Sequence, residues 1–409
     1  MERKNKKVIL VNSAVYLPGE GGYKRTVYLF DMMHKLGYDP ILLTSDFNHY
    51  NKQTRNINEF KKVYPDYAES IEFIHVPAYK KNISLKRILS EKVWTKAIKD
   101  WFVKHKNEVD AVMLSMPDMN TILAIENICR KNNIEIIIDV RDLRPEAFRV
   151  LVKNDTLYKI LLYPMKCKAN RAYSCADKLF AVSKEYLLRG SSVNKRAKVR
   201  KTVYIGAALD RFDGGVEKHL DSIDKMDNDI WVTYVGTLGV SYDLMTLIDS
   251  ARLLKQLGYS NIKIVILGQG PDAEALKQYA SSIGADNVEF IGFVNYEKVA
   301  AYLKKSDMTV NAIKKRGSQS IINKVADYFA AGVPMLNGCT CKEQQQMVED
   351  YEIGLNYEAE NPMSLTEAII KLRDNPNICK TYGLNARKLA EQQFNREHSY
   401  MEIINSIYD

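Results

Sequence analysis

Residues 230–267 contain the pattern that decides the fold. Residues 230–236 read IWVTYVG, residues 244–256 read LMTLIDSARLLKQ, and residues 262–267 read IKIVIL. The two short apolar runs are typical of buried strands, and the stretch between them has the apolar spacing of a helix. A strand, a helix and a second strand in this order predict a parallel sheet that is covered by helices.

The same alternation occurs in two series along the chain. In the first series we expect strands at 8–11, 40–44, 71–76, 111–115, 135–140, 178–182 and 203–205, with helices such as 26–36 and 119–131. In the second we expect strands at 230–236, 262–267, 288–291, 308–312, 334–336 and 353–356, with helices at 244–256, 271–282, 296–306, 323–331 and 362–374.

We therefore predict an α/β protein of two Rossmann-like, doubly wound parallel-sheet domains that face each other across a cleft. The domains are residues 1–206 and 207–385, and a C-terminal helix over about 386–409 packs back on the first. Residues 210–228 are rich in Gly and Asp and weakly apolar, so we interpret them as a linker.

The charge is divided unevenly between these halves. The 409 residues hold 59 Lys and Arg against 50 Asp and Glu, a net charge of +9. Residues 1–206 carry 38 basic and 22 acidic residues, a net +16, so residues 207–409 carry a net −7. With 20 Gly, 11 Pro and 6 Cys, the composition excludes collagen-like, disulfide-scaffold and wholly disordered chains.

No segment predicts insertion into a membrane. The apolar run at 8–11 is interrupted by Asn12-Ser13 and is too short for a secretory signal, and no run reaches the roughly 18 residues of a spanning helix. The cysteines form no CxxC pair and no Cys/His cluster, so we expect reduced thiols and no metal site. We expect a cytoplasmic protein whose membrane contact is peripheral.

Loops that follow predicted strands are the candidate ligand sites, because open α/β sheets bind ligands at the carboxyl ends of their strands. Residues 17–26 place three glycines before a helix, where free N–H groups suit a phosphate. Residues 136–146 place several charges after an apolar run, where carboxylates can take sugar hydroxyls or act as a base. The alternatives are an ordinary Gly-rich connection and a salt-bridged loop.

Residues 311–334 form the densest candidate. A cationic loop opens a helix in which Lys324 and Asp327 lie three apart on one face. Such a loop suits a diphosphate, and a carboxylate one turn later suits ribose hydroxyls; the alternative is a solvated helix with an i,i+3 ion pair. Residues 268–273 (GQGPDA) fit the relaxed dinucleotide pattern GxGxxA, but the motif follows the second strand of its half, which argues against an NAD site.

Residues 324–334, KVADYFAAGVP, resemble the K-L-F-E-Y-M-A-A-G-K-P signature of bacterial GT-B glycosyltransferases of family 4, those of surface-polysaccharide clusters. Supporting similarities to that family occur from residue 7 to about 395. They are the Gly-Gly loop at 21–26, the D-x-R-D-x-W-P-E segment at 139–146, the AD…AVS segment at 176–183, the Y-x-G-x-x-G donor loop at 235–244 and the I-x-G-x-G-P segment at 266–271.

The resemblance implies the GT-B fold, a nucleotide-sugar donor held by the C-terminal domain, an acceptor held by the N-terminal domain, and retention of anomeric configuration. It implies no cofactor and no obligate metal. The catalytic residues that we expect from it are Gly22, Asp142 and Lys324. The donor-binding residues are Gly236, Thr237, Gly268, Arg316, Gln319, Asn323, Lys324 and Asp327. The acceptor-binding residues are Gly21, Arg25, Asp139, Arg141 and Glu146.

The chain departs from the family at the donor site. The family has two glutamates eight residues apart, and here Gln319 and Asp327 stand at that spacing. Many members have a basic residue after the glycine of the Y-x-G loop, and here Gly236 precedes Thr237-Leu238. The charge that balances a diphosphate must then come from residues 314–316 or Lys324, and we expect Lys324. No His lies at an obvious strand end, so a departing phosphate oxygen is expected to take the acceptor proton.

The basic residues of the first half alternate with apolar ones over residues 80–106 and 153–171, and more follow at 195–201. Helices of this kind dock on anionic membrane surfaces; the alternative is half-buried helices with solvated lysines. No fold module or base-stacking signature indicates nucleic acid. We expect a lipid-linked or polysaccharide acceptor, and a location peripheral to the inner face of the cell membrane.

The sequence thus predicts a glycosyltransferase that moves a sugar from a UDP- or GDP-sugar to a glycan or lipid-linked oligosaccharide in cell-surface polysaccharide synthesis. Two alternatives stay open. One is a nucleotide-sugar 2-epimerase of the same architecture. The other is a non-catalytic nucleotide- or glycan-binding protein, which the departures at Gln319 and Asp327 motivate.

Overall fold

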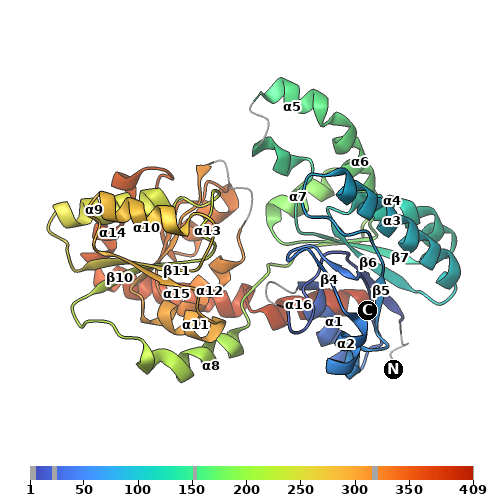
Figure 1. The fold of residues 1–409 in the computed structure, drawn as a ribbon, viewed down its shortest axis with the longest axis horizontal. Helices are drawn as coiled ribbons and strands as arrows, with labels where there is room; N and C mark the ends of the chain where they lie inside the picture. Colours follow the sequence, from blue (N-terminus) through green and yellow to red (C-terminus); the bar gives the residue numbers. More distant parts are fainter. Residues whose placement is uncertain (1–5, 21–24, 151–153, 316–320, 409) are drawn as a thin grey trace. The chain divides into compact units, whose positions relative to one another are not determined.

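The structure is a computed structural model that describes residues 6–20, 25–150, 154–315 and 321–408 (Figure 1). The chain divides into two compact units, each with its own parallel sheet. Unit 1 comprises Met1–Val203 and Tyr400–Asp409, and unit 2 comprises Tyr204–Ser399. The prediction of two parallel-sheet α/β domains is confirmed.

Unit 1 is built on a seven-stranded sheet with the order β5-β2-β1-β6-β7-β8-β9, in which all paired strands are parallel. Its strands are β1 (Val8–Val11), β2 (Ile41–Ser45), β5 (Ile71–Ile74), β6 (Ala111–Met116), β7 (Glu135–Val140), β8 (Lys178–Ala181) and β9 (Val199–Thr202), and a separate hairpin contains β3 (Phe47–Asn48) and β4 (Gln53–Thr54). All four residues of β1 are buried, because helices cover both faces of the sheet. This burial is why a central parallel strand is apolar at every position.

The helices of unit 1 begin at residues that the sequence marks. They are α1 (Arg25–Lys35), α2 (Ile57–Val63), α3 (Leu85–His105), α4 (Met119–Lys131), α5 (Asp155–Leu161), α6 (Tyr163–Ser174), α7 (Lys184–Ser191) and, at the C-terminus, α16 (Arg396–Tyr408), with the short 3₁₀ helices η1 (Pro65–Tyr67) and η2 (Glu146–Val150). The side chains of Ser84, Asp118 and Ser183 cap α3, α4 and α7 by accepting backbone N–H bonds. Figure 1 shows α5 projecting away from the sheet of this unit.

Unit 2 contains a six-stranded parallel sheet with the order β12-β11-β10-β13-β14-β15. Its strands are β10 (Ile230–Val235), β11 (Ile262–Leu267), β12 (Val288–Gly292), β13 (Met308–Asn311), β14 (Met335–Asn337) and β15 (Gly354–Asn356). Its helices are α8 (Leu209–His219), α9 (Leu244–Gln256), α10 (Ala273–Ser282), α11 (Tyr296–Lys305), α12 (Lys324–Ala331), α13 (Lys342–Asp350), α14 (Pro362–Arg373) and α15 (Pro376–Gln393), with η3 (Leu220–Ser222).

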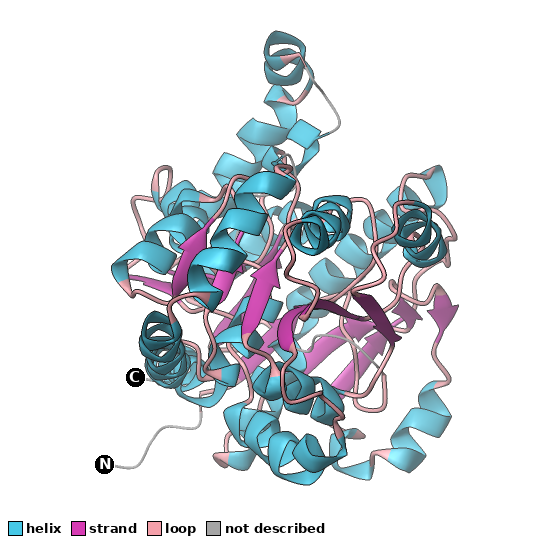
Figure 2. Cartoon of the chain, turned by 90° about the vertical axis from the view of Figure 1, so that its left-hand side faces the viewer, coloured by secondary structure: helices cyan, strands magenta, loops and turns pink. Residues whose placement is uncertain are grey.

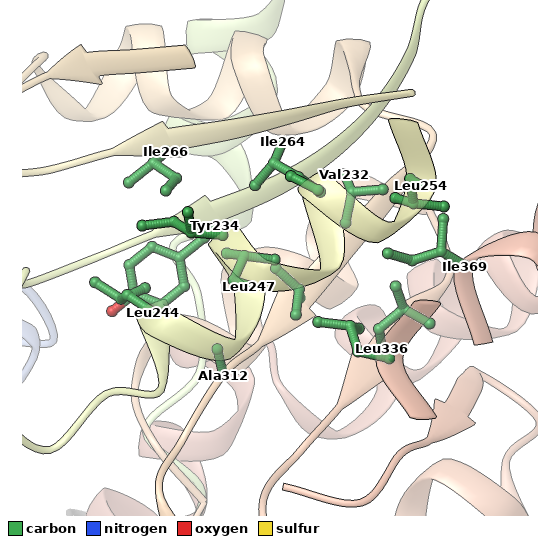
Figure 3. Packing of buried hydrophobic residues seen from close by; sticks show 14 of the residues in the cluster. Val232, Tyr234, Leu244, Leu247, Leu254, Ile264, Ile266, Ala312, Leu336 and Ile369 are labelled. Atoms are coloured by element: carbon green, nitrogen blue, oxygen red, sulfur yellow. The ribbon is translucent and has the colours of Figure 1, made fainter. Parts of the chain in front are cut away.

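Alternate residues of β10 face two different helix layers. Val232 and Tyr234 belong to the buried cluster that includes Leu247 of α9, and Figure 3 shows these side chains interdigitating. Trp231 and Val235 belong to a cluster on the other face, which α11 contributes to. Figure 2 shows the magenta strands with cyan helices around them from a second direction. The period of two along the strand therefore places β10 at the centre of a doubly covered sheet.

Residues 210–228, predicted as a linker, are largely helical, so that prediction was wrong. They contain most of α8, which packs on α11 within unit 2. The packing depends on Gly215, because a Cβ built there would come within 2.8 Å of the Glu297 Cα. The glycine that suggested a linker is thus the residue that lets two helices approach closely.

Two further elements differ from the sequence prediction. The last strand of unit 1 is β9, at Val199–Thr202 instead of 203–205; it lies at the sheet edge, where its polar Arg and Lys residues are typical. The single helix expected over about 386–409 is two helices, α15 and α16. The helix is interrupted around Asn395, whose side chain accepts hydrogen bonds from the backbone N–H groups of Glu397 and His398 at 3.0 and 3.4 Å. Residues of α16 from Tyr400 onward pack in the core of unit 1.

Candidate functional site

In unit 2, the strand order reverses next to β10, which is where open α/β sheets bind ligands. The chain adds β11 and β12 on one side of β10 and later places β13, β14 and β15 on the other. The last registered pair between β10 and β13 is at Thr233. Beyond it, the Tyr328 hydroxyl of α12 accepts a hydrogen bond from the Val235 N–H at 3.0 Å and donates one to the Val235 carbonyl at 3.3 Å. The Tyr328 side chain thus makes the backbone hydrogen bonds that a neighbouring strand would otherwise make to Val235.

Two strand-end loops next to this point lie in close contact because they contain glycines. Gly268 has a φ of +133°, and a Cβ built there would come within 1.9 Å of the Gly236 carbonyl oxygen. A Cβ on Gly270 would come within 2.1 Å of the Leu238 carbonyl oxygen. The Leu238 N–H donates to the Gln269 carbonyl at 3.0 Å. The GxG pattern at 268–270 is therefore explained by packing between two loops.

The side chain of Lys324, the first residue of α12, lies over the end of β10. Its Nζ donates a hydrogen bond to the Tyr234 hydroxyl at 2.9 Å and lies 4.0 and 4.1 Å from the ring centres of Tyr234 and Tyr242. The Tyr234 hydroxyl in turn donates to the Thr237 carbonyl at 2.9 Å. Gly236 completes the enclosure, since a Cβ there would lie 2.2 Å from Nζ. We call this group of five residues the lysine enclosure.

The lysine enclosure holds an amino group that has lost much of its water. Burial lowers the pKa of the Lys324 ammonium well below its usual value, and no carboxylate among the described residues opposes that shift. The faces of the two tyrosine rings offer partial negative charge, which stabilises the ammonium without neutralising it. An anion that reached Nζ would form a charge-assisted hydrogen bond in a weakly screened environment. The site is therefore suited to a phosphate oxygen.

Asp327 follows Lys324 by three residues on α12. The Tyr296 hydroxyl donates a hydrogen bond of 2.7 Å to its Oδ1 atom. Burial raises the pKa of the Asp327 carboxyl to about 6, although Tyr296 and Arg396 act in the opposite direction. At neutral pH the group is mostly ionised, so it can accept hydrogen bonds from hydroxyl groups.

The structure places the other predicted donor residues as follows. Gly236 and Thr237 belong to the lysine enclosure, and Gly268 packs against it. Asn323 precedes α12 and is exposed. The predictions for Arg316 and Gln319 lie outside the described residues.

In unit 1, the strand order reverses next to β1, and a hollow of about 620 Å³ lies at this edge of the sheet. It is lined by segments that follow β1, β2, β6 and β7 and by residues of α3 and α6. The polar and aromatic residues of the lining include Asn12, Ser45, His49, Tyr50, Tyr79, Arg87, Glu91, Trp94, Asp118, Arg141, Asp142, Arg144 and Lys168. Such a hollow has the size of a small-molecule site.

Arg25 and Asp139, both predicted to contact the acceptor, form a buried ion pair. Arg25 Nε and Nη2 each donate to the carboxylate at 2.9 Å, and the two side chains have 0% exposure. Arg25 also donates to the Val203 carbonyl at 3.1 Å and lies 4.8 Å from the ring centre of Tyr400. Arg141 Nε donates to the same carboxylate at 2.7 Å. This burial argues against direct acceptor contact by Arg25 and Asp139, and indicates that the pair positions Arg141.

Asp142 and Arg141 line the hollow, whereas Glu146 does not. Burial raises the pKa of the Asp142 carboxyl, and Arg144 opposes the shift. Glu146, in η2, accepts a hydrogen bond from Arg189 Nε of α7. Gly21 and Gly22, predicted for acceptor binding and catalysis, lie outside the described residues.

Sequence reasoning named Lys324 and missed the tyrosines around it. Tyr234 is the last β10 residue facing the α9 layer, two positions before Gly236, and an aromatic residue there is a signal that could have identified it. Tyr242 reaches the site because its loop forms a bridge to Ile313 after β13. No local sequence pattern shows that contact.

Residues 216–389 match the family model described as Glycosyl transferases group 1. An uncharacterized glycosyltransferase of Methanocaldococcus jannaschii, MJ1069, is 26% identical over 235 residues, which are 56% of this chain and 57% of the relative. A protein of Escherichia coli K12 with the provisional name colanic acid biosynthesis glycosyl transferase WcaI is 25% identical over 199 residues, 48% of this chain and 47% of the relative. The chain thus matches about half the length of these curated relatives.

Solved structures resemble the whole chain. Anabaena Alr3699/HepE in complex with UDP has a TM-score of 0.69 at 15% identity, covering 98% of this chain and 99% of that one. WaaG, a glycosyltransferase involved in lipopolysaccharide biosynthesis, has a TM-score of 0.66 at 14% identity, covering 97% and 98%. These likenesses confirm the predicted GT-B fold. The matched domain and the names of the relatives support the predicted enzyme class, a glycosyltransferase.

Proposed function

We propose that this protein transfers a sugar from a nucleotide-sugar to a glycan or lipid-linked acceptor in the synthesis of a cell-surface polysaccharide. The observation that carries the proposal is the lysine enclosure, a desolvated lysine at the switch point of unit 2 within the matched segment. The biosynthetic names of WcaI and WaaG support a surface glycan as product. The UDP in the HepE structure supports a UDP-linked donor.

The donor diphosphate lies on Lys324 in this proposal. The ammonium is the cation of the lysine enclosure, and the glycines at 236 and 268 let a ligand approach the backbone closely. Asp327, one turn along the same helix, accepts hydrogen bonds from the ribose hydroxyls. Because Lys324 supplies positive charge where the leaving group departs, we propose turnover without an obligate metal.

The transfer forms a bond between an acceptor hydroxyl oxygen and the anomeric carbon and breaks the bond from that carbon to the diphosphate. The proton of the hydroxyl passes to the departing phosphate oxygen, and a nucleoside diphosphate leaves. Lys324 stabilises the charge that develops on this oxygen. Asp142, at the hollow of unit 1, orients the acceptor hydroxyl, and Arg141 contributes to binding the acceptor. From the family resemblance we propose retention at the transferred sugar.

The test is release of nucleoside diphosphate from UDP- and GDP-sugars by the purified protein, with and without lipid-linked acceptors and with EDTA. We expect release from a UDP-sugar that EDTA does not abolish. Lys324→Gln should lower kcat/KM by about 100-fold, because it removes a preorganised cation at the leaving group. Lys277→Gln is the matched control, since Lys277 of α10 is 52% exposed and lies 3.9 Å from Glu274.

NMR of the sugar products separates this proposal from its alternatives. A glycoside with retained configuration supports transfer, whereas a free sugar or nucleotide-sugar inverted at C2 indicates a 2-epimerase. Binding of nucleotide without release of diphosphate from any donor indicates a binding protein. Equal activity of Lys324→Gln and wild type contradicts the assignment of the lysine enclosure as the donor site.

We also propose that unit 1 docks on an anionic membrane surface. Large apolar side chains are exposed on the first turns of α3 and on α5, and lysines and arginines alternate with them. Leu85 is 84% exposed on α3, and Ile160 is 67% exposed on α5. Cations near such a surface contribute roughly 1 kcal/mol each, and exposed apolar groups add insertion energy. Among the described residues, none of the helices has the length and apolarity needed to cross a membrane.

Sedimentation with vesicles tests this docking. We expect binding to vesicles with phosphatidylglycerol, weaker binding to pure phosphatidylcholine, and loss of binding as salt rises. Ile160→Ser should weaken it, whereas Leu384→Ser should not, because Leu384 is 65% exposed on unit 2. Equal binding of both variants would show that α5 does not contact the membrane.

A further inference from the structure

The hollow of unit 1 gathers arginines from two separate parts of the chain. Arg87 belongs to α3, and Arg141 and Arg144 follow β7. Lys168 of α6 adds a fourth cation to the lining. The sequence separates Arg87 from Arg144 by more than fifty residues, so their convergence is a property of the fold.

Among the described residues, these arginines use only a few of their hydrogen-bond donors. A guanidinium carries five N–H groups. Arg141 uses one, its Nε, on Asp139, and Arg87 uses Nε on Glu91 and Nη1 on the Asn82 carbonyl. Arg144 makes no side-chain hydrogen bond among the described residues, although it lies 6.0 Å from the Phe148 ring. All three arginines line the hollow, so it can accommodate an acceptor-only group such as a carboxylate or phosphate.

Arg87 and Arg144 converge on His49 and Tyr79. Both cations act on the His49 ring, whose pKa is lowered to about 4, first by burial and then by Lys52, Arg87 and Arg144. They also act together on the Tyr79 hydroxyl, which hydrogen-bonds to His49 Nδ1. The ring is therefore neutral at pH 7. It contributes a polar group to the hollow and no negative charge.

The lining carries an excess of positive charge, with the four cations Arg87, Arg141, Arg144 and Lys168 against the three carboxylates Glu91, Asp118 and Asp142. Burial raises the pKa values of Asp118 and Asp142. Asp118 accepts hydrogen bonds from Trp94 Nε1 at 3.0 Å and from the Thr121 N–H at 3.2 Å, so its oxygens are engaged. Glu91 forms an ion pair with Arg87 at 2.9 Å. The walls also contain apolar side chains, which reduce screening and strengthen the attraction of the arginines for an anion.

We propose that the hollow of unit 1 binds an anionic group of the acceptor, a phosphate or a sugar carboxylate, on Arg87, Arg141 and Arg144. That the anion belongs to a sugar acceptor rests on the proposed function, whereas the binding of an anion rests on the residues of the hollow alone. A lipid phosphate and an acidic sugar share the chemistry that the arginines recognise. The positioning of Arg141 by the buried Arg25–Asp139 pair is explained if Arg141 contacts this ligand.

The test is equilibrium titration of the full chain with inorganic phosphate, glucuronate and neutral glucose, without nucleotide. Trp94 lines the hollow, so its fluorescence in a Trp101→Phe/Trp231→Phe background reports occupancy locally. We expect binding of at least one anion, no binding of glucose, and affinity that falls with salt. Stronger binding of phosphate indicates a phosphate-bearing acceptor, and stronger binding of glucuronate indicates an acidic sugar.

Arg144→Gln should lower the affinity for the anion about tenfold or more, since it removes a charge-assisted donor. Arg87→Gln is the second variant, and Lys92→Gln is the control, because it removes an exposed cation of α3 outside the lining. Lys324→Gln, which disables the proposed donor site, should bind the anion like wild type. The proposal is overturned if neither anion binds wild type, if both arginine variants bind like wild type, or if Lys324→Gln alone loses the anion.

Discussion

The Nζ atom of Lys324 lies where a side chain on residue 236 would begin. A Cβ built on Gly236 comes within 2.2 Å of Nζ and 2.9 Å of Lys324 Cε, and the glycine has a φ of +149°. The two residues are 88 positions apart, in the loop after β10 and in α12. The absence of a side chain at one position thus makes room for the cation at the other.

Gly236→Ala should therefore displace Lys324 and disable the donor site. We expect nucleotide affinity to fall by about tenfold or more, because the ammonium loses its place beside the Tyr234 hydroxyl. The backbone conformation adds strain of roughly 1–3 kcal/mol. Isothermal titration with UDP and thermal unfolding measure the two effects.

Gly258→Ala is the matched control for that strain. Gly258 has a φ of +91°, and a Cβ built there would meet nothing within 4 Å, so an alanine is strained without contact. It should lower stability and leave UDP affinity unchanged. If both variants bind UDP equally well, the contact between residues 236 and 324 has no role in binding.

Asp327→Asn should stabilise the protein at neutral pH. Burial raises the pKa of Asp327 from 3.8 to about 6. Between these two pH values, the folded state holds a proton that the unfolded state has released. The stability that this proton provides is present below about pH 4 and is lost as pH rises through 6. A shift of this size corresponds to about 2–3 kcal/mol.

Urea unfolding at pH 4 and pH 8 measures this dependence. The gain of Asp327→Asn over wild type should be near zero at pH 4 and about 2–3 kcal/mol at pH 8. Glu274→Gln, at a 76% exposed position, should show no such change. A pH-independent difference would mean that Asp327 titrates normally in the folded protein.

The fold was predictable because strands such as β1 are short apolar runs and helices such as α4 and α9 have a buried stripe. The predicted bounds of α4, α9 and β11 match the structure. The exceptions have a physical cause. α8 contains Gly214 and Gly215, and adjacent glycines suggest a linker. Only the contact of Gly215 with Glu297 shows why a helix has a glycine at this position.

The site was predictable only in part. Lys324, Gly236 and Asp327 were identified through local motifs, and their assignment to the donor stays a prediction. Tyr234 and Tyr242 meet Lys324 through tertiary folding, which no spacing reveals. Arg25 was assigned to the acceptor because the loop at 21–26 resembles the Gly-Gly loop of the family. Its partner, Asp139, lies 114 residues away in the sequence.

The buried pair of Arg25 and Asp139 should be a major determinant of the stability of unit 1. Arg25→Met leaves a buried carboxylate with Arg141 as its remaining partner, and we expect a loss of about 3–5 kcal/mol in urea unfolding. Arg196→Gln removes a 55% exposed partner of Asp177 and should cost at most about 1 kcal/mol. Similar losses in the two variants would show that the buried pair contributes no more than a surface pair.

The adjacent glycines of α8 should respond in opposite directions to alanine. Gly214 is exposed and has nothing within 4 Å of a Cβ, so Gly214→Ala should stabilise by about 0.5–1 kcal/mol through helix propensity. Gly215→Ala should destabilise by roughly 1–3 kcal/mol, because its Cβ would lie 2.8 Å from the Glu297 Cα and 2.9 Å from the Glu297 carbonyl oxygen. Thermal unfolding of the two variants measures both signs. If residues 210–219 were a linker, neither change would shift the midpoint, since neither helix propensity nor contact with α11 would apply.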